Sequence, residues 1–413
     1  MKGMANEPKD PRGGKGASSE RLHFLDNLKT FIIFLVVFFH AAYAYSVYFS
    51  RDWYVADTQH SLFFDGFILT AFAFMMPVMF FVAGYMGVGS LTRKGQAPFW
   101  RDKLLRIVTP WALGALFVAP AISYVYSVGR GLYPSYLYYW IHYFSGSEYQ
   151  SHGQVHFYFL CVLTLYYVFL SVAYRIYKPL GSIVAPKKAT AHFLALFGLA
   201  TGIIFFCGNL FIDEGRWVKI AIFDLPATRF IPYLCYFFLG VLAYRRQWFT
   251  PSGYNPGLRN WALMCPPSFI LFIHFFLKNQ SLPGKVGMVC FAVFYFFFCL
   301  TAVFALIALF QKRLDFTTRF LTNLAAHSYG TYFIHYLVMV IIILALRGLH
   351  LNVFLKWLLA GALSATVSYL ISKHFLSRTP FFGKSAKQAK PGPGYGREAL
   401  AGLAPIGGSR GAD

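Results

Sequence analysis

Residues 21–40 read RLHFLDNLKTFIIFLVVFFH and place a histidine, His40, inside a strongly apolar stretch. An ionisable side chain at that depth in a membrane helix is unfavourable against lipid, so we expect His40 to face a cavity or a partner. Two interpretations stay open on this segment alone. His40 is either a functional residue or a core histidine that is hydrogen-bonded to a neighbouring helix.

The composition places the whole chain in a membrane. Of its 413 residues 57% are hydrophobic and only 13% are charged, which is too apolar for a soluble fold of this length. We therefore predict an all-α integral membrane protein. Long apolar runs predict about ten transmembrane helices, with both ends of the chain on one side: 31–47, 62–88, 107–125, 155–173, 193–211, 227–244, 261–277, 286–310, 329–346 and 353–369.

The basic residues predict the orientation. The tails and alternate connections hold 28 of the 37 Lys and Arg residues, and the other side holds 9. The side rich in basic residues is expected to be cytoplasmic, so both termini are expected there. The net charge of +22 is therefore a topology signal and does not call for nucleic acid.

Three regions are expected along the chain. Residues 1–20 and 376–413 are rich in Gly, Pro, Lys and Ser and are predicted to be disordered cytoplasmic tails. Residues 21–375 are predicted to form the membrane domain. No cleavable signal peptide is recognisable before the first span, which is expected to direct its own insertion.

Acidic residues are scarce within the predicted spans. Asp65 lies near a span edge and Asp26 at the cytoplasmic mouth of the first span, whereas a proton-coupled transporter usually buries carboxylates near the midplane. Lys29 and His40 are eleven residues apart, so they share one helix face and lie about 16 Å apart along the axis. They are predicted to line one channel that runs from the cytoplasm into the membrane.

A basic cluster precedes the third predicted span. The segment FWRDKLLRIVTPW carries Arg101, Lys103 and Arg106 on the predicted cytoplasmic side. Such residues are often only topological anchors at a helix end. The alternative is a site for a phosphorylated cytosolic ligand, because Arg offers bidentate contacts to phosphate oxygens and Lys a point charge.

Several motifs in order carry a family resemblance. The segments RLHFLDNLK, MMPVMFFVAGYMG, RDKLLRIVTPW, HFYFL and SYGTYFIHY, together with His40, resemble the membrane-bound acyltransferase-3 superfamily over about residues 21–375. Within it the chain is most similar to the glucan biosynthesis protein C type, which is associated with succinylation of osmoregulated periplasmic glucans.

The resemblance implies a ten-helix enzyme, expected in the bacterial inner membrane. It would transfer a succinyl or acetyl group from cytosolic acyl-CoA to a hydroxyl of a periplasmic glucan or other carbohydrate. The family's basic-residue and histidine pattern falls on Lys29 and His40, and its paired basic pattern falls on Lys103 and Arg106. In many members the first position of each pattern is Arg. Lys stands at both positions here, which removes bidentate geometry.

The expected chemistry assigns a role to each candidate residue. His40 is the candidate base, since an acceptor hydroxyl needs a base, and Asp26, at the cytoplasmic mouth of the same helix, is the second candidate catalytic residue. Lys29, Arg101, Lys103 and Arg106 are the candidate anchors for the phosphates of acyl-CoA, which is a donor substrate and not a bound cofactor. No metal is needed. Candidates for substrate contacts are His156 and Tyr158 on the outer side, where the acceptor would bind, and His335 on the cytoplasmic side, where the donor would bind.

Two other classes of protein remain as alternatives. A transporter or flippase would move a glycan or lipid without modifying it, and an inert scaffold would keep the fold without the chemistry. The shortage of intramembrane carboxylates and the lack of a nucleotide-hydrolysing motif argue against transport. His40 itself argues against an inert scaffold.

Overall fold

A computed structural model describes residues 22–51, 53–129, 131–132, 135–144, 153–220, 223–281 and 284–383. Tail residues 1–20 and 384–413 lie outside this part of the chain. Residues 376–383, however, are ordered: a short 3₁₀ helix follows the last long helix, and the Phe382 ring packs 5.2 Å from both Tyr329 and Phe333. The folded domain therefore extends past the predicted boundary at residue 375.

Most of the described residues are helical. The α-helices are α1 (His23–Tyr43), α2 (Leu62–Lys94), α3 (Gln96–Lys103), α4 (Thr109–Leu113), α5 (Ala119–Gly129), α6 (Tyr136–Tyr143), α7 (Tyr158–Ile176), α8 (Ala191–Asn209), α9 (Phe230–Arg245), α10 (Leu258–Ser281), α11 (Lys285–Arg313), α12 (Arg319–Leu346) and α13 (Val353–His374). Two π-helical segments, η1 (Leu104–Val108) and η2 (Gly114–Val118), and three 3₁₀ turns, η3 (Val155–Phe157), η4 (Lys178–Gly181) and η5 (Leu376–Arg378), complete the set.

Each of the ten predicted spans overlaps a helix, although a few extend by two to four residues past a helix end. Within the described residues, nine helical segments are long and apolar enough to cross a membrane, and the segment Gln96–Gly129 counts as one of them because α3, η1, α4, η2 and α5 run on without a break. The tenth, α9, has 16 residues and is about 24 Å long, against roughly 30 Å of hydrocarbon. The prediction of an all-α membrane protein is confirmed.

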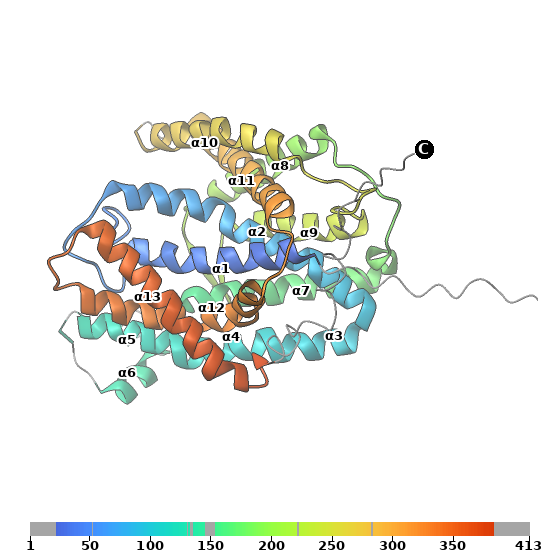
Figure 1. Cartoon of the computed structure of the whole chain (residues 1–413). Coiled ribbons are helices and arrows are strands. Elements are labelled where there is room, and N and C mark those ends of the chain that lie inside the picture. Colours follow the sequence, from blue (N-terminus) through green and yellow to red (C-terminus); the bar gives the residue numbers. More distant parts are fainter. Residues whose placement is uncertain are drawn as a thin grey trace, which may run out of the picture.

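Helix α1 lies at the centre of the bundle (Figure 1) and packs against α2, α11, α12 and α13. Buried apolar side chains such as Leu28, Ile32 and Val37 lie around most of its circumference, as expected for a helix surrounded by protein. The helix begins eight residues before the predicted span, because the mixed polar and apolar residues 23–29 form its first two turns, and it ends at Tyr43. His40 therefore lies in its last turn.

Close contact of α2 with α9 depends on glycine. A Cβ atom at Gly84 would lie 1.9 Å from the carbonyl oxygen of Phe237, and one at Gly240 would lie 2.0 Å from that of Phe81. The two helix backbones thus touch, as small residues permit in membrane bundles. A short hairpin precedes α9, in which strand β1 (Trp217–Ile220) pairs antiparallel with β2 (Phe223–Pro226).

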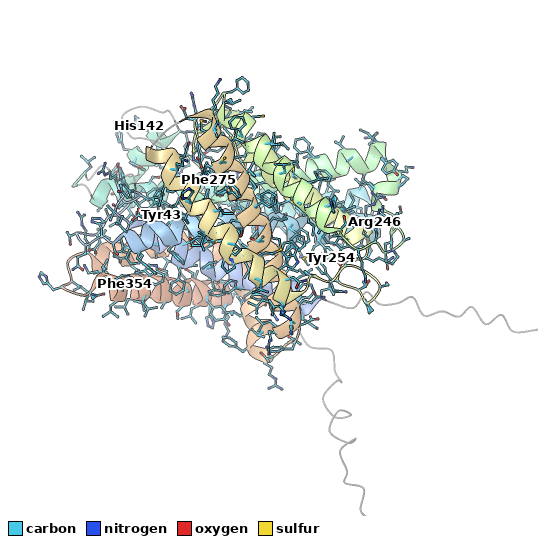
Figure 2. The ribbon with its side chains drawn as sticks, turned by 90° about the horizontal axis from the view of Figure 1, so that it is seen from above. Tyr43, His142, Arg246, Tyr254, Phe275 and Phe354 are labelled. Atoms are coloured by element: carbon cyan, nitrogen blue, oxygen red, sulfur yellow. The ribbon has the colours of Figure 1, made fainter. Side chains whose placement is uncertain are left out.

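At one end of the bundle several segments meet. The end of α1, the residues that follow it and the starts of α2 and α13 lie together on the left of Figure 1. Figure 2 shows the same end from above, with Tyr43 on the last turn of α1 and Phe354 on the first turn of α13. The candidate site lies close to this end.

Candidate active site

His40 is paired with a second histidine. Its Nδ1 atom lies 3.1 Å from Nε2 of His335, which projects from α12, and the two rings are nearly parallel with centroids 5.3 Å apart. His335 is completely buried, whereas His40 keeps part of its surface accessible. The partner that the sequence required for His40 is therefore this histidine, and the accessible member of the pair is His40.

The partners of the two rings assign their tautomers. Nδ1 of His335 lies 2.7 Å from the backbone carbonyl oxygen of Tyr332, which can only accept, so this nitrogen carries the proton. In the neutral ring Nε2 of His335 is then an acceptor, and Nδ1 of His40 must donate to it. The proton of His40 is thus on Nδ1. Its Nε2 atom is unprotonated and has no hydrogen-bond partner among the described residues, so it carries the lone pair that a general base needs.

A third histidine adjoins the pair. The ring of His156 lies 4.9 Å from that of His335, and Nε2 of His156 donates to the carbonyl oxygen of Phe333 at 3.3 Å. Its Nδ1 atom is buried without a hydrogen-bond partner among the described residues. The preceding residue, Val155, has a φ of 51°, which is unusual for a β-branched residue. Backbone strain of this kind concentrates at functional sites.

His156 and His335 were expected on opposite sides of the membrane domain, and this expectation is wrong. The apolar run 155–173 predicts that His156 lies toward the outer side, and the run 329–346 predicts that His335 lies near the cytoplasmic side. Helix α12 begins ten residues earlier, at Arg319, so His335 lies sixteen residues, or about 24 Å, into it. One histidine cluster, defined as His40, His156 and His335, replaces the two separate sites.

Aromatic rings surround the histidine cluster. Tyr336 stacks on His156 with a centroid distance of 5.3 Å and an interplanar angle of 7°, and it lies 4.8 Å from His40. Tyr332 donates its hydroxyl to the backbone carbonyl of His156 at 2.5 Å, which holds the η3 turn against α12. Tyr332 and Tyr336 are themselves buried, so they shield the His335 and His156 side of the cluster from solvent.

Asp26 does not contact His40. It lies fourteen residues earlier on α1, about 21 Å along the axis, where its carboxylate accepts from Nζ of Lys29 at 3.5 Å. Asp26 is therefore separate from the histidine cluster, and the hydrogen-bond partner of His40 is His335. Asp26 and Lys29 form a local i,i+3 ion pair at the start of the helix, and both are partly exposed.

The three basic residues of the predicted phosphate site differ in environment. Arg101 is exposed and Arg106 is half-buried, while the ammonium group of Lys103 lies 3.9 Å from the centre of the Tyr167 ring. Lys103 thus makes a cation–π contact with α7 in this structure. The π-helical turn η1 follows it, a distortion that is frequent at functional sites.

A hydrogen bond links this basic segment to the helix of His335. The hydroxyl of Tyr329 donates to the backbone carbonyl oxygen of Arg106 at 2.6 Å. Tyr329 precedes His335 by six residues, about 9 Å of helix rise. The basic segment therefore contacts α12 about 9 Å of helix rise before the residue of α12 that belongs to the histidine cluster.

Tyr158 lies next to a buried cation that the sequence did not single out. Its hydroxyl is close enough to Arg229 to interact with it electrostatically, and its ring meets the edge of Trp217 at 4.7 Å. Arg229 is 7% exposed and forms an ion pair with Glu214. Its Nε atom has no hydrogen-bond partner among the described residues.

A buried ion pair was also missed. Lys356 of α13 and Asp57, in the connection between α1 and α2, have side chains that are 1% and 0% exposed, and Nζ lies 3.0 Å from both carboxylate oxygens. Lys356 falls inside the last predicted span and was counted only as a basic residue of the outer side. A lone lysine within an apolar run was the signal that predicts a buried partner.

The fold and the site together define a class: a multi-pass membrane protein with a histidine cluster inside its helix bundle. Residues 22–373 match the model of the acyltransferase domain family, acyltransferase 3, and the chain belongs to this family. It is therefore a membrane acyltransferase, as the sequence motifs predicted. Comparison with curated proteins and with solved structures gave no match.

Proposed function

We propose that this protein transfers a succinyl or acetyl group from cytosolic acyl-CoA to a hydroxyl of a glucan or another carbohydrate outside the cytoplasm, in the manner of the glucan biosynthesis protein C type. The observation that carries the proposal is the His40–His335 pair. It leaves a lone pair on Nε2 of His40, and His40 is the one residue of the cluster that is not fully buried.

In the proposed reaction His40 acts as the base. Nε2 takes the proton of the acceptor hydroxyl while the oxygen attacks the thioester carbonyl carbon, and the carbonyl π electrons move to its oxygen. When this oxyanion collapses, the C–S bond breaks and the thiolate takes the proton from His40. The products are an ester and free coenzyme A. Transfer of the acyl group through Nε2 of His40 itself is the alternative sequence of steps.

His335 supports both states of His40. In the resting enzyme its Nε2 accepts from Nδ1–H of His40 and fixes the ring. When His40 becomes an imidazolium, the same bond becomes charge-assisted and therefore stronger. His335 is a positioning residue, because it acts on the reacting atoms through His40.

The donor is proposed to bind from the side of Arg101, Lys103 and Arg106. These residues carry the positive charge that the phosphates of coenzyme A need. The Tyr329–Arg106 hydrogen bond joins their segment to α12, about 9 Å of helix rise before His335. Lys29, on the central helix α1 and also partly exposed, is proposed to add to the same positive field.

The acceptor is proposed to bind from the side of His156 and Tyr158. Carbohydrate sites combine aromatic faces with a few polar groups. Here the Arg229 guanidinium carbon lies 4.8 Å from the Phe72 ring, and the hydroxyl of Tyr233 and Nε of Arg229 are buried without hydrogen-bond partners among the described residues. Unpaired donors of this kind suit a ligand that is rich in hydroxyl groups.

The proposal is tested in proteoliposomes. Purified protein is given labelled acetyl-CoA or succinyl-CoA on the side to which Arg101 is exposed, and glucan oligosaccharides on the other side. The expected result is an alkali-labile acyl ester on the oligosaccharide together with stoichiometric release of free coenzyme A. Transfer that proceeds only when donor and acceptor share one side would contradict the transmembrane arrangement.

A further inference from the structure

The connection between α1 and α2 contributes a tryptophan to the histidine cluster. This connection, residues 44–51 and 53–61 of the described chain, is called the α1–α2 loop below. The Trp53 ring stacks on Tyr43 with centroids 4.2 Å apart, and it lies almost parallel to the His40 ring at 6.1 Å. It also packs 5.3 Å from Tyr336. Trp53 therefore forms part of the wall around the accessible histidine.

The indole N–H of Trp53 is buried without a hydrogen-bond partner among the described residues. Buried tryptophan N–H groups are normally paired, because an unpaired donor has lost its hydrogen bond to water and the protein supplies no replacement. Trp357, on α13, makes the usual bond: it donates to the carbonyl oxygen of Phe38 at 3.0 Å. An unpaired donor beside the catalytic base indicates that its partner arrives with the substrate.

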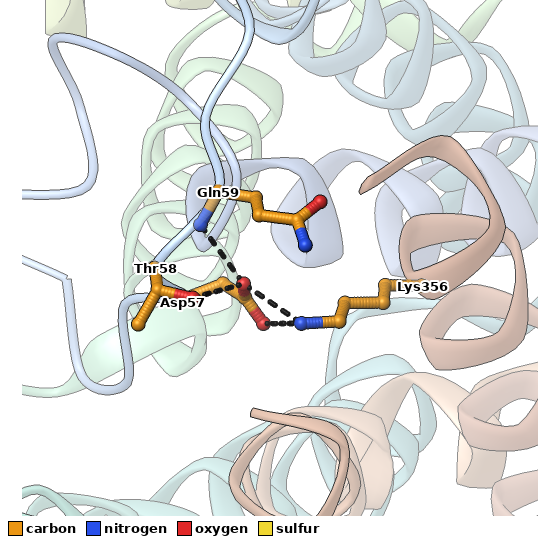
Figure 3. A network of polar contacts seen from close by, with 4 residues as sticks. All are labelled: Asp57, Thr58, Gln59 and Lys356. Carbon is orange, nitrogen blue, oxygen red and sulfur yellow. Dashed lines mark hydrogen bonds and ion pairs between the residues drawn. The ribbon is translucent and has the colours of Figure 1, made fainter. Parts of the chain in front are cut away.

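A buried ion pair holds the α1–α2 loop in place (Figure 3). Asp57, four residues after Trp53, accepts from Lys356 at both carboxylate oxygens and from the backbone N–H of Gln59, each at 3.0 Å. Both charged side chains are withdrawn from water. Since separation would leave two unpaired buried charges, the pair strongly fixes the end of the loop against α13.

A second carboxylate fixes the beginning of the loop. Asp65, on the first turn of α2, accepts from the hydroxyl of Ser46 and from the backbone N–H groups of Val47 and Tyr48, at 2.5, 2.9 and 3.0 Å. The loop is thus anchored on both sides of Trp53. Anchoring at both ends is what a residue needs when its donor must meet a reacting atom within a fraction of an ångström.

We propose that Trp53 is a catalytic residue that donates its indole N–H to the carbonyl oxygen of the acyl thioester, and that the Asp57–Lys356 pair positions it. This assignment rests on the proposed function. As the acceptor oxygen bonds to the carbonyl carbon and His40 Nε2 takes its proton, the carbonyl π electrons move to the oxygen that Trp53 faces. The C=O bond re-forms as the C–S bond breaks, and the sulfur takes the proton from His40. The indole N–H is not consumed.

The first test replaces Trp53 with phenylalanine, which keeps the stacked ring and removes the N–H. The full-length protein in proteoliposomes is assayed for release of coenzyme A from acetyl-CoA and succinyl-CoA, with glucan oligosaccharides as acceptor. Loss of one donor to an oxyanion lowers kcat by about 10²–10³. We expect a loss of this size in Trp53→Phe, with the donor KM and the thermal midpoint unchanged, because the lost N–H has no partner in the resting protein.

Trp357→Phe is the matched control. It removes an indole N–H that does have a partner, so it is expected to lower the thermal midpoint while leaving kcat close to that of the parent. A Trp53→Phe variant with the kcat of the parent overturns the assignment. Failure of the proposed function is a different result: the parent protein itself transfers no acyl group, which overturns the assignment together with the function.

The second test removes both charges of the positioning pair. Asp57→Asn combined with Lys356→Met leaves no unpaired buried charge, so the double variant is expected to fold. Its kcat is expected to fall, and Trp53→Phe is expected to lower kcat much less in this background than in the parent, because the indole is no longer held in place. Fully additive losses would show that the pair does not act through Trp53 and would overturn its role.

Discussion

Replacement of His335 with leucine tests the orientation of the catalytic base. Leucine fills a similar volume in this completely buried position, but it cannot accept the hydrogen bond that now joins His335 Nε2 to His40 Nδ1 at 3.1 Å. A hydrogen bond to a charged group contributes about 1.5–3 kcal/mol, which corresponds to roughly a 10- to 150-fold change in rate. The bond gains this strength when His40 becomes an imidazolium, so we expect kcat to fall by that factor.

The assay is steady-state release of coenzyme A by the purified protein at saturating donor and acceptor. His335→Gln is the matched variant, since its side-chain oxygen can still accept from His40, and it is expected to retain much more activity than His335→Leu. Folding should survive both changes, because the Tyr332 carbonyl lies within α12, where the helix backbone also supplies donors. A His335→Leu variant that turns over as fast as the parent would refute the orienting role.

Three further predictions concern other parts of the molecule. Arg106→Ala should raise the donor KM about ten- to a hundred-fold through loss of a charge-assisted contact to phosphate, and an unchanged KM would make Arg106 a topological anchor only. A cysteine placed at Ser90 should resist labelling by a membrane-impermeant maleimide in intact cells, and strong labelling would reverse the orientation. Burial raises the pKa of Asp224, on strand β2, above its ordinary value near 3.8. Ionisation of Asp224 is therefore less favourable in the folded protein than in the unfolded chain. As the pH rises from about 3.8 to the raised pKa, the free energy of unfolding falls. Asp224→Asn should therefore raise the thermal midpoint at neutral pH relative to the parent, and a fall would contradict this.

The sequence predicted the spans well because a membrane leaves the backbone few choices. Every predicted apolar run overlaps a helix, since hydrogen bonds within the segment must replace water inside the bilayer. His40 was predicted for a related reason, because an ionisable group in an apolar run requires a partner. Hydropathy did not locate helix ends, and α12 begins ten residues before the apolar run that marked it.

The missed features depend on contacts between residues far apart in the chain. His40 and His335 are separated by 295 residues, and Asp57 and Lys356 by 299. No spacing rule on a single helix joins such residues, and the loop that carries Trp53 has no periodicity that predicts its position. For Lys356 a signal was present, since a lysine inside an apolar run implies a buried counter-charge. The carbonyl of Tyr332 that fixes the tautomer of His335 lies only three residues away on α12, but the tautomer of His40 follows from the long-range contact with His335.

The rate of acyl transfer by His40→Gln tests the central claim most directly. Glutamine keeps a polar side chain of similar size and can still donate to His335, but it has no basic nitrogen to take a proton from the acceptor. Loss of general base catalysis costs about 10²–10⁴ in rate. With purified protein at saturating acyl-CoA and acceptor, we expect His40→Gln to lose transfer by at least that factor while donor affinity and the thermal midpoint stay those of the parent. Transfer by His40→Gln at a rate near that of the parent would contradict the assignment of His40 as the base.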